Sequence, residues 1–249
     1  MLRRWNLLLW SLQAWNYRLR VEPRQTRYLL GHLCAGETVI EISNGSGAST
    51  YWLAQAVGQT GRVIAFVEDA KTARRLLRRS AQRTPSVTVE NLRLFPGTSP
   101  HSAVAQPGAM GRSSNDGGPQ IACFTGVRET GVTTLDQYLR DRPGLNVNAV
   151  RFDNIGYELE ILQGAKQMLV QQRPRILFAS PPSSALTTVQ DNVLQFLARH
   201  GYHGYFFAAD GLEDIRLFDA DRHRADPSLP GYVRNFLFMP APRSRQLAA

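Results

Sequence analysis

The chain has 249 residues, 43% hydrophobic and 20% charged, which suits one large buried core better than two. No apolar run reaches the roughly 18 residues that span a bilayer, so we expect no integral membrane protein and a cytoplasmic location. Two cysteines, Cys34 and Cys123, exclude a disulfide scaffold and a four-cysteine zinc site. The net charge is +9, but the arginines are scattered apart from a cluster around Arg74–Arg79. We therefore expect a solvated basic surface and no specific nucleic-acid binding.

The first twenty residues have the pattern of an amphipathic helix. Five apolar residues share one face of it at 3.6-residue spacing: Trp5, Leu8, Leu9, Leu12 and Leu19. We assign residues 1–35 to an N-terminal helical extension that packs on its own domain. A peripheral membrane contact through residues 1–20 is the alternative, because tryptophans suit a membrane interface.

Strands and helices alternate after residue 36. Short apolar segments rich in β-branched residues predict strands at 38–43, 62–67, 87–95, 149–154 and 175–179. Segments with a helical pattern predict helices at 49–57, 70–82, 135–142, 157–172 and 187–201. This order is typical of a parallel sheet with right-handed crossovers. The last two strands, 202–209 and 233–240, have no helix between them, so we expect them to pair antiparallel.

Residues 96–120 interrupt this order. They are rich in glycine, proline and serine and have no periodic apolar face, which predicts a long flexible loop. Segments 121–127 and 132–134, which follow it, fit a small hairpin. We expect one domain over 36–240, with this loop inside it, and a disordered tail at 241–249.

A glycine turn ends the first strand, in the sequence VIEISNGSG. The strand carries Glu41 and leads through Ser43, Gly45 and Gly47 into a helix. Glycines let the backbone approach a ligand closely, and a helix N-terminus attracts a carboxylate or phosphate. A dinucleotide site usually needs G-x-G-x-x-G, which is not the spacing here. A nicotinamide-dependent oxidoreductase stays open as an alternative, and it predicts a parallel final strand.

The acid, serine and two glycines resemble the first motif of class I S-adenosylmethionine-dependent methyltransferases, with Ser43 in place of the first glycine. Further segments resemble the FkbM-type methyltransferases: RVIAFVEDAKTARRLLRR, VTTLDQYL, VRFDNIGYELEILQGAKQMLVQQRPRILFA, GYHGYFFAADG and NFLFMP. The resemblance covers about residues 36–240. It implies an α/β fold with a Rossmann-like class I methyltransferase sheet of about seven strands, mostly parallel, with an antiparallel C-terminal hairpin.

The resemblance also implies an activity. Such enzymes transfer a methyl group from S-adenosylmethionine to an oxygen, often a hydroxyl of a sugar or natural product, so we expect a small-molecule or glycan acceptor. It assigns the cofactor to Glu41, Ser43, Gly45 and Gly47, with Glu68 or Asp69 near the ribose. It assigns the catalytic, acceptor side to Asp153 and Glu158, with Asp153 as the proton acceptor. The five histidines show no metal-ligand spacing, so we expect no metal, and the sequence favours no oligomeric state.

Three positions depart from the family pattern. Acids that are usual in the family are replaced by Val67, Ile155 and Ala179. All three lie at carboxyl ends of expected strands, where an open α/β sheet binds its ligands. A changed acceptor pocket would explain them. A catalytically impaired methyltransferase-like domain that acts as a binding or interaction module would explain them equally well.

Overall fold

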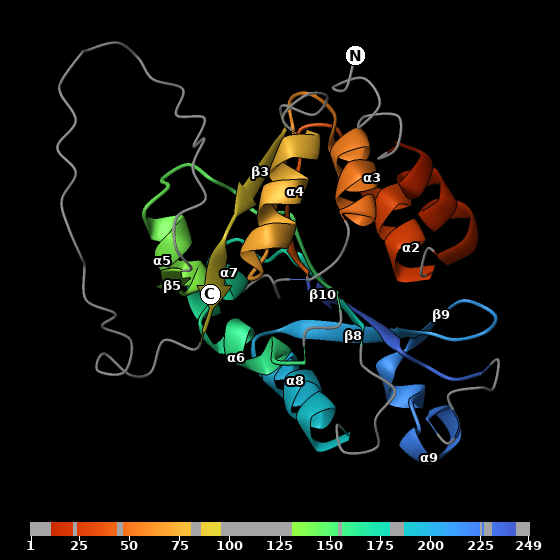
Figure 1. The fold of residues 1–249 in the computed structure, drawn as a ribbon. Helices are drawn as coiled ribbons and strands as arrows, with labels where there is room; N and C mark the ends of the chain where they lie inside the picture. The colour runs from red at the N-terminus through yellow and green to blue at the C-terminus, as the bar shows by residue number, and fades with distance from the viewer. Residues whose placement is uncertain are drawn as a thin grey trace, which may run out of the picture.

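The computed structural model describes residues 11–21, 24–43, 47–80, 86–95, 131–153, 156–179, 187–224, 226 and 231–242. One large sheet dominates these residues (Figure 1). Five of its strands run parallel: β1 (Thr38–Ser43), β2 (Arg62–Phe66), β3 (Val87–Glu90), β6 (Ala149–Asp153) and β7 (Arg175–Ala179). The remaining three form its C-terminal part: β8 (Tyr202–Phe207), β9 (Leu212–Asp214) and β10 (Asn235–Pro240).

The strand order is β3-β2-β1-β6-β7-β10-β8-β9. β10 lies between β7 and β8 and runs antiparallel to both, which confirms the expected antiparallel return. It also excludes the parallel final strand of a nicotinamide-dependent oxidoreductase. The sheet has eight strands rather than about seven, because the chain turns after β8 and adds β9 antiparallel at the edge.

The prediction of a single strand at 87–95 is wrong, because the segment is interrupted at Asn91 and forms two strands. The side-chain Nδ2 of Asn91 donates to the backbone oxygens of Val67 and Glu68, both at 2.8 Å. After this break, β4 (Leu92–Leu94) leaves the main sheet and pairs in parallel with β5 (Gly131–Thr133). The hairpin partner expected at 121–127, like the loop at 96–120, lies outside the described residues.

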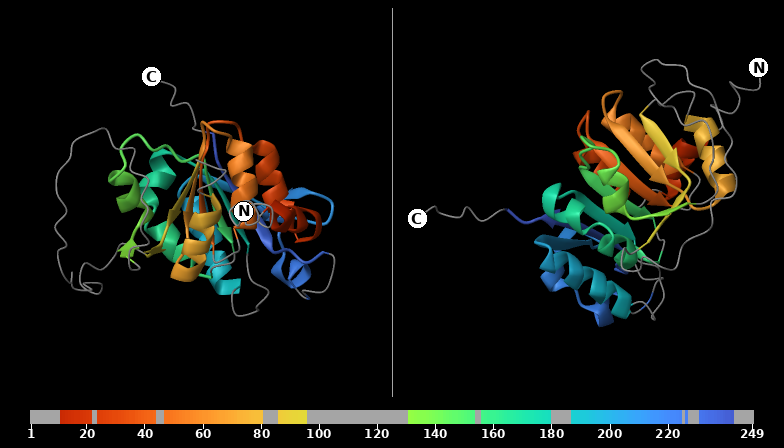
Figure 2. Two further views of the ribbon diagram at one scale, coloured as in Figure 1. Left: turned by 45° about the horizontal axis from the view of Figure 1, so that its top comes forward. Right: turned by 90° about the vertical axis from the view of Figure 1, so that its left-hand side faces the viewer.

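Helices cover both faces of the sheet (Figure 2). On one face lie α2 (Arg24–His32), α3 (Ala48–Val57) and α4 (Ala70–Ser80), side by side in Figure 1. On the other lie α5 (Leu135–Arg140), α6 (Glu158–Gln163), α7 (Lys166–Gln171) and α8 (Thr187–Arg199). The single helix expected at 157–172 is divided at Gly164, where a Cβ would lie 2.6 Å from the backbone oxygen of Phe95. A short helix, α9 (Ala220–His223), precedes β10.

The N-terminal segment packs differently from the expectation. Residues 11–16 are helical and continue into a π-helix, η1 (Tyr17–Val21). The contact with the domain is made by the buried Ala14, whose backbone oxygen accepts a hydrogen bond from Trp52 Nε1 at 2.8 Å. Leu12 and Leu19, expected on the packed face, are 61% and 76% exposed. Within the described residues, no helix is long and apolar enough to cross a membrane.

Candidate functional site

Two opposite charges lie buried in the centre of the sheet. The parallel pairing of β1 and β6 sets Glu41 directly beside Arg151, and both side chains are 0% exposed. Arg151 Nη1 donates to Glu41 Oε1 at 2.7 Å. A buried charge is strongly unfavourable unless it is paired and hydrogen-bonded. This pair therefore explains how two apolar strands can each carry an ionised residue.

Both carboxylate oxygens of Glu41 accept hydrogen bonds from protein groups. Ser49 Oγ donates to its Oε1 at 2.6 Å, and the hydroxyl of Thr50 donates to its Oε2. Both donors belong to the first turn of α3, so the carboxylate ties β1 and β6 to the start of this helix. The structure therefore gives Glu41 a structural role between β1, β6 and the start of α3.

Arg151 links this buried pair to the edge of the sheet. Its Nη2 lies 3.2 Å from Asp153 Oδ1, and Asp153 is 31% exposed. Its Nε donates to Thr26 Oγ1 in α2 at 3.3 Å. Burial alone would lower the pKa of Arg151, but the charges of Asp153 and Glu41 outweigh burial and raise that pKa. The guanidinium therefore stays charged and holds one oxygen of Asp153.

Sequence reasoning missed Arg151. The signal was present, because an arginine between apolar residues of a buried strand must have an acidic partner. Asp153 lies two positions further along the same extended strand, so both side chains point to the same face. The neighbouring strand β1 carries one charged residue, Glu41, which is therefore a second candidate partner for Arg151.

The carboxyl ends of β1 and β6 bring two expected site residues together. Ser43 and Asp153 are paired in register as the last residues of their strands. Gly47 begins α3 with a φ of 77°, and a Cβ at this position would lie 2.4 Å from Leu76 Cδ1. The left-handed backbone therefore favours glycine at 47, and a larger residue would also displace the end of the Leu76 side chain. Gly45 and Ile155 lie outside the described residues.

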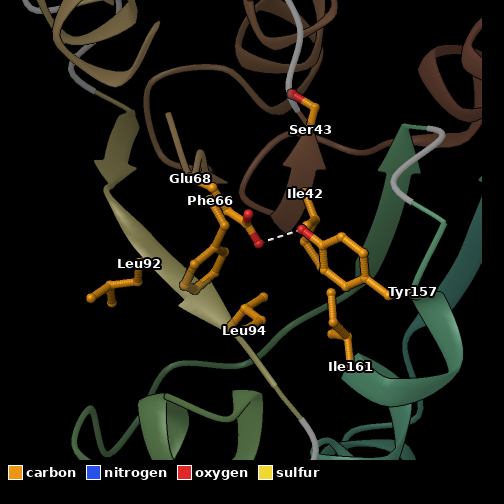
Figure 3. A pocket seen from close by; sticks show the side chains of 8 residues that line it. All are labelled: Ile42, Ser43, Phe66, Glu68, Leu92, Leu94, Tyr157 and Ile161. Carbon is orange, nitrogen blue, oxygen red and sulfur yellow. Dashed lines mark hydrogen bonds between the residues drawn. The ribbon is translucent and has the colours of Figure 1, made fainter. Parts of the chain in front are cut away.

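A small pocket opens beside Ser43 (Figure 3). Its volume is about 10 Å³, room for about one water. Its lining comes from β1, β2, β4 and α6 with their adjoining loops: Ile42, Ser43, Phe66, Glu68, Leu92, Leu94, Tyr157 and Ile161. The Tyr157 hydroxyl donates to Glu68 Oε1 across it. Burial, together with this bond, raises the pKa of Tyr157, so the phenol stays protonated and serves as a donor.

The two neighbouring acids after β2, Glu68 and Asp69, have different roles. Glu68 lines the pocket and is 33% exposed, with Arg93 Nε 3.8 Å from its Oε1. Asp69 Oδ2 accepts from the backbone N–H of Thr72 at 2.7 Å, which caps the start of α4. Hydrogen bonds from Thr72 lower the pKa of Asp69. The structure thus separates a pocket residue from a capping residue, which the sequence could not do.

The remaining expected residues have clear local surroundings. Glu158 is 5% exposed, and its Oε1 accepts from the backbone N–H of Gly156 at 3.1 Å. Val67 is 0% exposed and packs with Ala73 and Leu76 of α4, so it presents no polar group to a ligand. Ala179 ends β7. In the part of the chain that the structure describes, no group of three or more acidic, histidine or cysteine side chains could hold a metal ion.

One family model matches this chain, and the solved structures that it resembles are methyltransferases. The model of the methyltransferase FkbM domain matches residues 42–203, more than half of the chain. A solved FkbM methyltransferase from Methylobacillus flagellatus is similar at 15% identity and a TM-score of 0.48, over 82% of this chain and 43% of that chain. A SAM-dependent methyltransferase from Aquifex aeolicus is similar at 12% identity and a TM-score of 0.50, over 90% and 92%.

A curated relative matches over a shorter stretch. It is the tRNA (adenine(57)-N(1)/adenine(58)-N(1))-methyltransferase TrmI of Methanocaldococcus jannaschii, 53% identical over 47 residues. The match spans 18% of this chain and 17% of that protein. The likeness to the solved structures establishes a class I methyltransferase fold, and the family model establishes the family within it.

Proposed function

Because the chain belongs to the FkbM methyltransferase family and uses S-adenosylmethionine, we propose that it methylates a hydroxyl of a sugar or natural-product acceptor. One observation carries this proposal. Asp153 ends β6 beside Ser43, half-buried, with Oδ1 held 3.2 Å from Arg151 Nη2. A carboxylate fixed on one side and open on the other is suited to take a proton from an acceptor hydroxyl.

The residues at this edge fit the cofactor by their chemistry. The Glu68 carboxylate is partly open to solvent and can accept hydrogen bonds from the two ribose hydroxyls. The N-terminus of α3, a helix of ten residues, offers N–H groups and a positive pole to the carboxylate of the methionyl part. The bond from Tyr157 supports Glu68 as the ribose acceptor, since it fixes the carboxylate at the pocket rim.

When bound, S-adenosylmethionine supplies a methyl group on a sulfonium, which is an excellent leaving group. The chain then has to orient the acceptor oxygen and remove its proton. We assign proton removal to Asp153. Arg151 fixes Asp153 Oδ1, and Glu158 holds the backbone of Gly156 close by, so both position the acceptor side.

A binding module without catalysis is the second candidate function. The observation that favours it is Val67, because a fully buried valine stands where the family usually carries an acid. The size of the pocket beside Glu68 also favours the binding module, because the pocket is too small for a nucleoside unless Tyr157 moves. A cytoplasmic location remains a prediction under both functions.

Titration calorimetry with S-adenosylmethionine tests the cofactor assignment. Glu68→Gln is expected to weaken binding about tenfold or more, because a bond to a charged acceptor is lost. Asp69→Asn is the matched control and should change binding less than about twofold, because asparagine also caps a helix. Equal weakening by both variants would contradict the role of Glu68. If the wild-type chain gives no heat of binding with S-adenosylmethionine, the proposed methyltransferase activity is contradicted and the binding module without catalysis is favoured.

Methyl-labelled S-adenosylmethionine tests the acceptor class. We expect label to enter hydroxyl compounds as ethers that survive mild alkali, in a panel of sugars and polyhydroxylated natural products. Transfer RNA belongs in the same panel, because the curated relative is named as a tRNA methyltransferase. Label on the bases of the RNA, or in alkali-labile esters, would contradict methylation of a sugar or natural-product hydroxyl.

A further inference from the structure

Exposed apolar side chains gather on the N-terminal segment. Seven large hydrophobic residues are exposed in the part of the chain that the structure describes, and three lie within eight residues: Leu12 (61%), Trp15 (51%) and Leu19 (76%). Their spacing of three and four residues places them on one side of the helix. The other four stand singly on separate elements: Val132, Val170, Leu217 and Met239. Single exposed hydrophobic residues are ordinary, whereas a contiguous stripe marks an interaction surface.

This stripe, formed by Leu12, Trp15 and Leu19, is held in a fixed orientation. The buried Ala14 faces the domain, and its backbone oxygen accepts from Trp52 Nε1. The Arg18 guanidinium lies 4.5 Å from the centre of the Trp52 ring, and Trp15 meets the same ring edge-on at 4.9 Å. The segment is therefore anchored through Ala14, Arg18 and one edge of Trp15, while Leu12 and Leu19 stay exposed to solvent.

The net charge of the chain is concentrated in two segments of the sequence, one of which carries the stripe. Residues 1–33 hold six arginines and one acid, a net +5, and α4 holds five basic residues and no acid. The other residues together are slightly acidic, so these two segments account for the whole excess of +9. Tyr51 connects them on the surface, because its ring lies 5.2 Å from Trp52 and packs against the apolar residues of α4. Figure 1 shows α4, α3 and α2 in one layer.

We propose that the stripe, together with Arg18 and the basic residues of α4, docks the protein on an anionic phospholipid surface. Leucine and tryptophan enter the interface between headgroups and acyl chains, and the arginines attract the anionic headgroups. A nucleic acid offers no apolar phase for the two leucines. A second copy would bring one +5 segment against another, which like charges disfavour. This docking surface is independent of the acceptor proposed above.

Vesicle co-sedimentation of the full chain tests the docking surface. We expect the wild type to sediment with vesicles of phosphatidylcholine and phosphatidylglycerol in roughly equal amounts, and little with phosphatidylcholine alone. The variant Leu12→Ser/Leu19→Ser should bind at least about tenfold more weakly. It leaves Trp15 on Trp52, so its unfolding temperature should match that of the wild type. The matched control is Val170→Ser/Leu217→Ser, which removes two comparably exposed residues elsewhere (54% and 65%) and should bind as the wild type.

Three outcomes would overturn the proposal. The first is equal binding of both double variants to the anionic vesicles. The second is a wild-type dimer in size-exclusion chromatography that Leu12→Ser/Leu19→Ser dissociates, because it would assign the stripe to a second copy. The third is salt-dependent binding of duplex RNA without binding of vesicles, because it would assign the arginines to nucleic acid.

Discussion

Replacement of Arg151 by methionine is expected to lower the free energy of unfolding by about 3–5 kcal/mol. The reason is that Glu41 would remain buried and charged without its cation, and among the described residues the hydroxyls of Ser49 and Thr50 would be its remaining donors. Asp153 contributes less to this loss, because it is 31% exposed and can be hydrated. Urea denaturation followed by circular dichroism measures the change.

The double variant Glu41→Met/Arg151→Met is the control for this prediction. When both charges are removed, most of the lost stability should return, because no uncompensated charge stays buried. The stability of Arg151→Lys should fall between those of the wild type and Arg151→Met. A lysine ammonium keeps the positive charge, but it lacks the planar fork of donors by which the guanidinium reaches both Glu41 and Asp153. A loss below about 1 kcal/mol for Arg151→Met would mean that the pair is hydrated in solution.

The sequence predicts the order of elements because each strand is a short apolar segment between turn residues. It also predicts the antiparallel β10, since 202–209 and 233–240 have no crossover helix between them. It does not predict register, and register is what places Glu41 beside Arg151 and Ser43 beside Asp153. The candidate site therefore follows in part from motifs and in part from pairings that only the folded sheet defines.

Local patterns misled where a longer-range contact decides the outcome. Apolar spacing placed Leu12 and Leu19 on the packed side of the first helix, but Trp52, a residue far along the chain, binds at Ala14 instead. The β-propensity of residues 87–95 predicts one continuous strand. Asn91 interrupts it, because its side chain donates hydrogen bonds to the backbone oxygens that follow β2. Glu68 and Asp69 looked equivalent until the packing of Tyr157 and Thr72 separated them.

Replacement of Asp153 by asparagine is expected to reduce kcat for methyl transfer by about 10²- to 10⁴-fold, the usual contribution of a general base. Asparagine keeps the size of the side chain and can still accept a bond from Arg151 through its carbonyl oxygen, but it cannot take the acceptor's proton. Calorimetry should show binding of S-adenosylmethionine within about twofold of the wild type, because the cofactor is assigned to other residues.

Glu160→Gln is the matched control for Asp153→Asn. It also removes one carboxylate near the start of α6, but Glu160 is exposed, so kcat should not change. The rate should be measured well below the unfolding transition, because loss of the charge beside Arg151 is expected to cost about 1–3 kcal/mol of stability. If Asp153→Asn keeps more than half of the wild-type kcat, the proton leaves to water or to the substrate itself. In that case the carboxylate of Asp153 serves only to neutralise Arg151 at the sheet edge.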